Sequence, residues 1–342
     1  MRTRLLASVN RLAVVMVVGV PAAVSAGQSL TPAAKTAIPA KSTEAWTPPR
    51  TPWGDPDLQG VFTNNDESGI PLERPAEFQG KQLADVSEAE LERLRQVRDE
   101  QRVRSAPNLG VLPGSNPVHW FENFGAQNSR AWLLVDPSDG RVPALTEDAQ
   151  KRPPVRGGSS FGNGPFNSTD DFSLYDRCIT RGIPGSMMPA IYGNAYQIVQ
   201  GPGYAAIRYE MIHETRVIPL DGRPHVGTNV RLDLGDARGH WEGNTLVVET
   251  TNFKQRSAYR NASAESFRLI ERFKAVAPDT VEWSVTIDDP TTWTRSWTFA
   301  MHLSKRDATQ QPFEYACHEG NYGMMNMLSA ARIAEKAAET AK

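Results

Sequence analysis

The segment "AYQIVQGPGYAAIRYEMIHETRVI", residues 195–218, decides the fold class of this protein. A Gly-Pro-Gly turn at 201–203 divides it into two extended pieces, and apolar and polar residues alternate in the second piece. A period of two is the pattern of a strand that buries one face. The segment therefore predicts a strand, a tight turn and a long second strand that continues to residue 218.

The sequence that follows repeats this pattern. Alternating segments at 244–253, 265–276, 279–289 and 294–304 each end in turn residues, and a Gly-Asn turn at 243–244 predicts a hairpin. Successive strands with short connections are typical of an antiparallel meander. We therefore expect a mainly β protein, folded as a lipocalin-like barrel or strongly curved sheet, with an N-terminal extension that contains a helix and with a C-terminal helix at 324–340.

The first 26 residues have the pattern of a secretory signal peptide. Arg2, Arg4 and Arg11 precede the apolar run "LAVVMVVGV", and small residues follow it. The run is too short for a stable transmembrane helix, although an uncleaved anchor is the alternative. The sequence thus predicts a periplasmic or secreted protein without a stable membrane span after signal cleavage.

The remaining chain divides by composition. Residues 27–45 predict a flexible tether, 46–150 an N-terminal extension and 151–342 a β-barrel-like domain with the C-terminal helix. Within the extension, Ser87 and Glu90 form a capping-box pattern that predicts a helix over 87–104. The stretch 158–162, "GSSFG", formally matches a nucleophile elbow, but it lacks the preceding strand and following helix and is interpreted as accidental.

Two cysteines, Cys178 and Cys317, are the only ones in the chain. In an oxidising compartment two cysteines favour a disulfide over two buried thiols or one reactive thiol. A Cys178–Cys317 bridge would close a loop of about 140 residues and contribute on the order of 4–5 kcal/mol in the chain-entropy model. The neighbouring His318 and Glu319 would then be held near a pocket mouth by the bridge.

Composition limits the classes of partner. The 342 residues include 37 basic and 39 acidic side chains, so the formal net charge is −2. A near-neutral chain without blocks of like charge lacks the basic footprint of a nucleic-acid-binding protein. The expected partner is a small-molecule substrate or ligand, and no oligomeric state is predicted.

Alternation also assigns side chains to faces, because successive side chains of a strand point in opposite directions. The predicted interior sets are Ile207, Tyr209, Met211, His213, Thr215 and Val217; Phe267, Leu269, Glu271 and Phe273; Val281, Trp283, Val285 and Ile287; and Arg295, Trp297, Phe299, Met301 and Leu303. The opposite face of the first strand carries Arg208, Glu210, Glu214 and Arg216. Three interior positions are therefore ionisable: His213, Glu271 and Arg295.

These three residues suit acid/base chemistry. A carboxylate on an apolar face with a histidine nearby can transfer protons, and an arginine can hold an anion or an oxyanion. We therefore predict Glu271 and His213 as a proton-transfer pair and Arg295 as the anion holder. The alternative is a Glu271–Arg295 ion pair that only fixes strand register. Further expected site residues are His318 and Glu319 at the pocket mouth and Tyr209, Trp283, Trp297 and Arg181 in the substrate pocket.

The chain offers little support for a cofactor or a metal. Neither H-E-x-x-H nor H-x-H occurs, although a metal site assembled from distant loops stays open. The favoured function is an exported small-molecule enzyme without a cofactor, of lyase, isomerase or hydrolase type, acting on an apolar or aromatic hydroxylated compound. The alternative is a periplasmic binding protein for a lipophilic ligand.

Four motifs extend this interpretation: "TPWGDPDLQGV" at 51–61, "RCITRGIPGS" at 177–186, "GHWEGNTLVVETTNF" at 239–253 and "YACHEGNYGM" at 315–324. With these motifs the chain resembles a family of secreted bacterial proteins of unassigned function, found in proteobacteria and acidobacteria. The resemblance covers nearly all of the chain from about Trp46 and implies export and a single architectural unit. It implies no activity and no catalytic residues.

Overall fold

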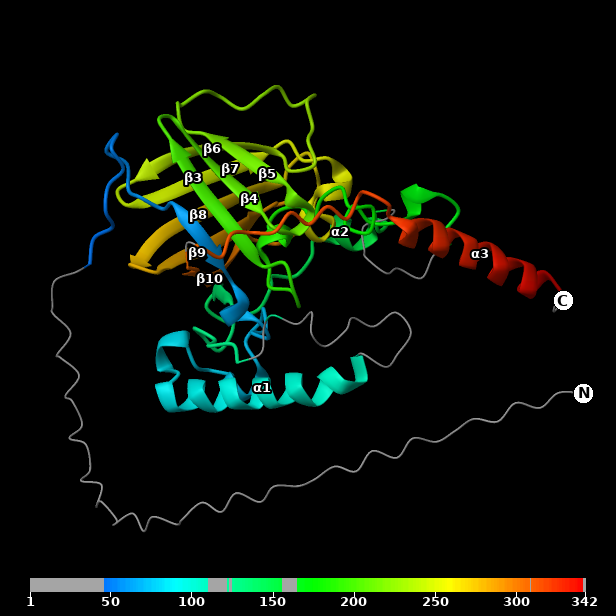
Figure 1. Cartoon of the computed structure of the whole chain (residues 1–342), viewed down its shortest axis with the longest axis horizontal. Coiled ribbons are helices and arrows are strands. Elements are labelled where there is room, and N and C mark those ends of the chain that lie inside the picture. The colour runs from blue at the N-terminus through cyan, green and yellow to red at the C-terminus, as the bar shows by residue number, and fades with distance from the viewer. Residues whose placement is uncertain (1–45, 110–121, 123–124, 156–164, 308, 341–342) are drawn as a thin grey trace, which may run out of the picture. The chain divides into compact units, whose positions relative to one another are not determined.

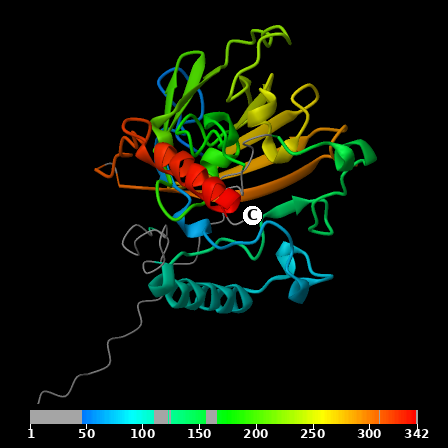
Figure 2. The ribbon, with the colours of Figure 1, turned by 90° about the vertical axis from the view of Figure 1, so that its right-hand side faces the viewer.

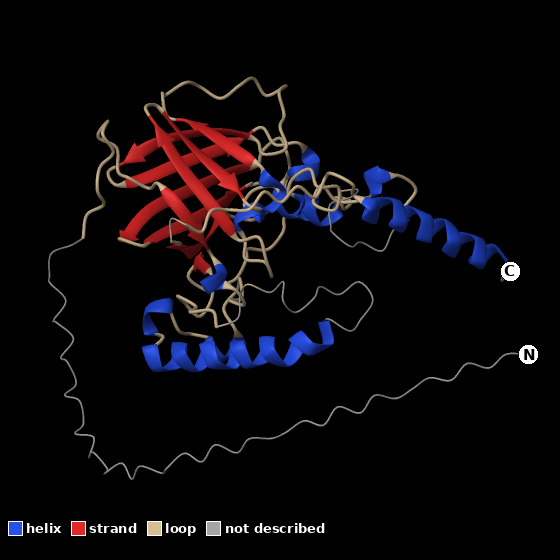
Figure 3. Cartoon of the chain, in the orientation of Figure 1, coloured by secondary structure: helices blue, strands red, loops and turns tan. Residues whose placement is uncertain are grey.

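A computed structural model of the chain describes residues 46–109, 122, 125–155, 165–307 and 309–340. The predicted signal peptide, the tether at 27–45 and the stretch 158–162 lie outside these residues. From Trp46 onward the chain forms one compact unit. In this unit the strands gather into a single curved body, and the helices lie at its periphery (Figure 3).

A ten-stranded antiparallel sheet makes up this body (Figure 1). The strands are β1 (Gly60–Thr63), β2 (Leu134–Asp136), β3 (Ala195–Gly201), β4 (Tyr204–Tyr209), β5 (Thr215–Pro219), β6 (Asp236–Glu242), β7 (Thr245–Thr251), β8 (Arg268–Ala277), β9 (Thr280–Asp288) and β10 (Trp297–Lys305). Their order is β5-β4-β3-β1-β10-β9-β8-β7-β6, and β2 pairs with β10. The mainly β, antiparallel class is confirmed. Strands β1 and β2, from the segment 46–150, pair with strands of the segment 151–342.

The sheet is strongly curved, but it is not closed into a barrel. Its two edge strands, β5 and β6, approach each other through side chains. A Cβ atom at Gly239 in β6 would lie 2.5 Å from Leu220 Cδ2 and 2.9 Å from Ile218 Cγ2. No backbone ladder joins these two strands in the described sheet, so the lipocalin-like barrel is not confirmed.

The concave side of the sheet holds the hydrophobic core, as alternation predicts for β8, β9 and most of β10. The buried side chains that alternation places on this side are Leu269, Glu271, Phe273, Val281, Trp283, Val285, Ile287, Trp297, Phe299, Met301 and Leu303. Large apolar side chains at such positions each contribute about 1.5–3 kcal/mol by leaving water. The period of two therefore identifies the core wherever a strand is unbroken.

The predicted long strand over 204–218 is wrong, because the chain turns in its middle. Strand β4 ends at Tyr209 and β5 begins at Thr215, and the 3₁₀ turn Met211–His213 lies between them. Ile212 and His213 both have left-handed backbones, with φ of 65° and 46°. A left-handed residue reverses the chain direction locally and breaks the phase of alternation.

The two faces of β5 are consequently exchanged relative to the prediction. Arg216 is buried although it was assigned to the outer face, and Val217 is 59% exposed although it was assigned to the interior. Ile218 is buried beside Arg216. His213 is half-buried in the turn rather than inside the sheet.

The predicted interior position of Arg295 is also wrong. Strand β10 begins at Trp297, so alternation does not extend back to Arg295. Its side chain is 54% exposed and forms an ion pair with Asp136 of β2, with Nη2 2.9 Å from Oδ1 and 3.1 Å from Oδ2.

Within the described ranges, three α-helices accompany the sheet: α1 (Glu88–Leu109), α2 (Glu147–Lys151) and α3 (Tyr322–Thr340). The predicted capping box is present, because Glu90 N–H donates to Ser87 Oγ over 3.3 Å and Ser87 N–H donates to Glu90 Oε2 over 3.0 Å. Helix α1 is attached to the rest of the unit by Arg98, whose Nη2 donates to the Ala131 carbonyl over 2.7 Å.

Helix α3 lies where the sequence predicts a C-terminal helix, and it projects from the side of the sheet (Figures 1 and 2). Met324 is its only buried residue. Among the helices that the structure describes, none has the length and apolar character needed to span a membrane.

Candidate functional site

The loop 173–185, which leads toward β3, is anchored by the disulfide between Cys178 and Cys317. The predicted pairing is therefore confirmed. Asn321 reinforces it, because its Nδ2 donates to the Asp176 carbonyl over 3.0 Å and to Cys178 Sγ over 3.6 Å. The C-terminal segment thus holds this loop in one position against the sheet.

Hydrogen bonds within the loop fix its shape further. Ser173 Oγ donates to Asp176 Oδ2 over 2.8 Å, and Asp176 N–H donates back to Ser173 Oγ over 3.0 Å. Thr180 Oγ1 accepts the Gly182 N–H over 2.8 Å and donates to Glu214 Oε2 over 2.6 Å. Side chains at these turns replace the backbone hydrogen bonds that an irregular loop lacks.

A second irregular segment, 255–261, lies between β7 and β8 and faces this loop. It contains the 3₁₀ turns Gln255–Ser257 and Tyr259–Asn261. Gln255 Nε2 donates to the Ala262 carbonyl over 2.8 Å, and Arg152 Nη1 donates to the Asn261 carbonyl over 2.9 Å. Both ends of the segment are therefore held by side chains.

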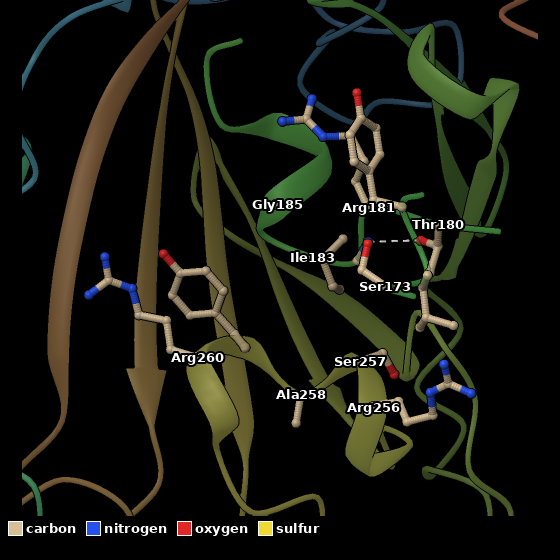
Figure 4. Close-up of a pocket in the computed structure, with 13 residues that line it drawn as sticks. Ser173, Thr180, Arg181, Ile183, Gly185, Arg256, Ser257, Ala258 and Arg260 are labelled. Carbon is tan, nitrogen blue, oxygen red and sulfur yellow. Dashed lines mark hydrogen bonds between the residues drawn. The ribbon is translucent and has the colours of Figure 1, made fainter. Parts of the chain in front are cut away.

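A cavity of about 190 Å³ lies between the two segments, and we call it the arginine pocket (Figure 4). Its lining residues are Ser173, Leu174, Tyr175, Thr180, Arg181, Gly182, Ile183, Gly185, Arg256, Ser257, Ala258, Tyr259 and Arg260. Ile183 and Ala258 lie in the middle of this group, and the three arginines point to different sides of it (Figure 4). The pocket combines a small apolar centre with hydroxyl groups and guanidinium groups.

Two of the three arginines rest on tyrosine rings instead of carboxylates. The guanidinium carbon of Arg181 lies 5.4 Å from the Tyr175 ring centroid, and that of Arg260 lies 5.7 Å from the Tyr259 ring centroid. Arg181 Nη1 is buried and has no hydrogen-bond partner among the described residues. A cation–π contact orients a guanidinium but leaves its charge uncompensated. These two groups are therefore available to an anion.

The third arginine is already paired. Arg256 Nη1 lies 3.2 Å from Asp170 Oδ1, which also lies 2.9 Å from Arg177 Nη1. Arg256 Nη2 additionally donates to the Phe172 carbonyl over 3.3 Å. Arg256 thus joins the two walls of the pocket, and its charge is partly neutralised.

Glu214 lies directly behind the pocket wall, on the far side of Thr180. Burial raises the pKa of Glu214 to about 6, and the hydrogen bond from Thr180 lowers it only in part. A carboxyl group with a pKa near neutrality can exchange protons at physiological pH. The Thr180 hydroxyl connects this group to the pocket.

Glu271 has a different environment from the one predicted. It is fully buried on β8, and Arg216 of β5 binds it through two hydrogen bonds, Nη1–Oε2 at 2.5 Å and Nη2–Oε1 at 3.1 Å. Trp283 Nε1 donates to Oε1 over 3.1 Å. Burial alone would lower the pKa of Arg216, but the Glu271 carboxylate outweighs burial and raises it. The ion partner of Glu271 is therefore Arg216 and not Arg295.

The other predicted site residues are dispersed. Arg181 lines the arginine pocket. His213 Nδ1 lies 3.1 Å from the Tyr315 carbonyl oxygen. The predicted pocket residues Tyr209, Trp283 and Trp297 are fully buried in the core.

His318 and Glu319 are both exposed, next to the disulfide. His318 lines a separate open cavity of about 340 Å³ together with Arg177 and Asn321. Among the residues whose placement is described, no three His, Cys, Asp or Glu side chains come together as a set of metal ligands.

Sequence reasoning missed Arg256, Arg260 and Glu214. The first two lie in "FKQRSAYRNAS", 253–263, a polar run between two strands whose only signal is a pair of arginines four residues apart. Glu214 was assigned to an outer face because the turn at 211–213 was not foreseen. None of the three stands out from a periodic pattern.

Comparisons with known proteins add little. No family model matches the chain, and the curated proteins give no significant match. One solved structure, a secretory abundant heat soluble protein from Ramazzottius varieornatus, aligns with 39% of this chain and 87% of its own, at 12% identity and a TM-score of 0.23. A similarity at that score carries no argument about fold or function.

Proposed function

We propose that this protein binds a small organic acid in the arginine pocket. The observation that carries the proposal is Arg181, whose Nη1 is buried at the pocket wall and has no hydrogen-bond partner in the described part of the chain. A buried charged donor without an acceptor is costly, and a ligand carboxylate would supply that acceptor. Tyr175 holds the Arg181 guanidinium in position without neutralising it. The hydroxyl and guanidinium groups of the lining favour an anionic ligand over the purely lipophilic one considered from the sequence.

Binding would take place outside the cytoplasm. The Cys178–Cys317 disulfide is compatible with an oxidising compartment, and the N-terminal sequence has the pattern of a secretory signal. We also propose that the chain belongs to the family of secreted bacterial proteins that its motifs resemble. The close packing of Gly239 on Leu220 supports a sheet of barrel type that is left open between β5 and β6.

An enzyme of lyase, isomerase or hydrolase type is the second candidate, and Glu214 favours it. Its pKa of about 6 suits a general base or acid, and the Thr180 hydroxyl links it to the pocket over 2.6 Å. A Glu214→Gln variant should then bind the acid normally but lose turnover. Turnover at the wild-type rate in that variant excludes Glu214 as the base.

Titration calorimetry of the full chain with a panel of organic acids tests the binding proposal. An Arg181→Met variant should lose at least tenfold in affinity, because one charge-assisted hydrogen bond contributes about 1.5–3 kcal/mol. Arg295→Met is the matched control, since Arg295 is the anion holder predicted from sequence and pairs with Asp136. Loss of affinity in the Arg295 variant but not in the Arg181 variant, or no binding of any acid, contradicts the proposal.

A further inference from the structure

The arginine pocket shares a wall with a second cavity. This side cavity measures about 370 Å³, and its lining residues are Pro154, Val155, Gln255, Arg256, Ala258, Arg260 and Asn261. Arg256, Ala258 and Arg260 line both spaces. The segment 255–261 thus separates the two cavities, with Arg256 near one end and Arg260 near the other. A molecule longer than the arginine pocket has room in the side cavity.

The backbone of this segment is held in a conformation that presents Arg260 at the rim. Arg260 and Asn261 are consecutive left-handed residues, with φ of 50° and 62°. Asparagine adopts this conformation more readily than arginine, so the arginine is the unexpected member of the pair. Asn261 is fixed by Arg152, and its Nδ2 donates to the Pro153 carbonyl over 3.4 Å. Strained backbone of this kind clusters at binding sites.

The uncompensated charges of the site lie apart from each other. Arg181 is at the top of the pocket in Figure 4 and Arg260 is at its left, and the two come from different segments of the chain. Neither forms an ion pair with any residue in the described ranges. The acidic groups closest in the network are already occupied, because Asp170 pairs with Arg177 and Arg256. Arg260 is exposed, and a single carboxylate at Arg181 would leave it without an ion partner among the described residues.

We propose that the ligand is an elongated organic diacid, an inference that rests on the proposed function. One carboxylate binds Arg181, and the other binds Arg260 in the segment that separates the two cavities. The body of the molecule lies over Ile183 and Ala258, the apolar centre of the pocket. Planar guanidinium groups bind carboxylates in paired hydrogen bonds, so two arginines oriented by tyrosine rings select a ligand by the separation of its acid groups.

Calorimetric titration of the full chain with straight-chain dicarboxylates of about four to eight carbons tests this inference, with monocarboxylates of equal length for comparison. At least one dicarboxylate should bind about tenfold more tightly than its monocarboxylate, which is the effect of one additional charge-assisted contact. Arg260→Met should reduce the affinity for that dicarboxylate to the level of the monocarboxylate, and it should leave monocarboxylate affinity within about twofold. Lys254→Met is the matched control, because Lys254 lies beside the same segment but pairs with Asp233.

The outcomes separate the two proposals. If Arg181→Met abolishes binding but dicarboxylates bind no better than monocarboxylates, acid binding stands and the diacid inference is overturned. Equal losses for both ligand types in Arg260→Met also overturn it. If no acid binds the wild-type chain, both proposals fail.

Discussion

Replacement of Glu271 by glutamine should destabilise the protein by about 3–5 kcal/mol, the range observed when one partner of a buried ion pair is removed. Glu271 and Arg216 have side-chain exposures of 0% and 3%, so water cannot solvate the arginine that is left behind. Glutamine keeps an oxygen that can still accept the Trp283 N–H. The loss of stability in Glu271→Gln therefore measures the ion pair with Arg216 and not the hydrogen bond from Trp283.

A double variant provides the matched comparison. Glu271→Leu combined with Arg216→Met removes both charges, and buried pairs replaced in this way are often neutral or even stabilising. The Trp283 N–H then lacks its acceptor, which costs about 1–3 kcal/mol. The double variant should thus be more stable than either single variant. Arg295→Met, which breaks an exposed pair with Asp136, should cost about 0–1 kcal/mol.

Urea unfolding followed by far-ultraviolet circular dichroism measures these differences. Tryptophan fluorescence is unsuitable, because Trp283 donates a hydrogen bond to Glu271 and its fluorescence would change with the substitution even without unfolding. A Glu271→Gln variant within about 1 kcal/mol of wild type would refute a structural ion pair. A variant that keeps full stability but loses turnover would instead restore the proton-transfer role predicted from the sequence.

Three further predictions concern the loop anchor, the sheet edges and pH. Replacing both Cys178 and Cys317 by alanine should lower the free energy of unfolding by up to about 5 kcal/mol in the chain-entropy model, since the sequence separation is 139 residues. The double variant should also bind the acid more weakly, because the loop 173–185 loses its anchor. Unchanged unfolding in urea and unchanged calorimetric affinity would contradict this prediction. Gly239→Val should lower the free energy of unfolding by about 1–3 kcal/mol, because the added side chain is too large for the space beside Ile218 and Leu220. Gly243→Ala, at an open turn, should not produce this packing effect. Urea unfolding of the two variants makes the comparison. The pKa of Glu214 in the folded state, about 6, lies above its ordinary value of 4.5, so the folded state binds more protons than the unfolded state. The free energy of unfolding should therefore fall by about 2 kcal/mol as pH rises from about 4.5 to about 6. Glu214→Gln should flatten this part of the plot of stability against pH, and an unaltered slope would argue against the raised pKa of Glu214.

The sequence by itself determined most of the strands and most of the core, although it missed the turn that divides 204–218 into two strands. Alternation is a local property, because each residue of a strand faces opposite to the next, so Trp283 on β9 and Phe299 on β10 could be placed inside without knowledge of their neighbours. The Cys178–Cys317 pairing followed from the presence of only two cysteines and the expectation of export. Local pattern and simple counting were sufficient for these features.

Only the tertiary structure decided which charges meet. Arg216 reaches Glu271 because two left-handed residues, Ile212 and His213, reverse the faces of β5, and because the curved sheet brings β5 across from β8. The alternating pattern gives no sign of a turn within it, so Arg216 was predicted to lie on the outer face.

The arginine pocket depends on the tertiary structure for a related reason. Its walls, the loop 173–185 and the segment 255–261, are irregular and distant in the sequence. No periodicity relates Arg181 to Arg260, and their segments are brought together by the disulfide, the path of the sheet and the contacts of Arg256. A pattern in the sequence specifies which face of a strand is buried, but the position of a loop depends on long-range contacts that no local pattern encodes.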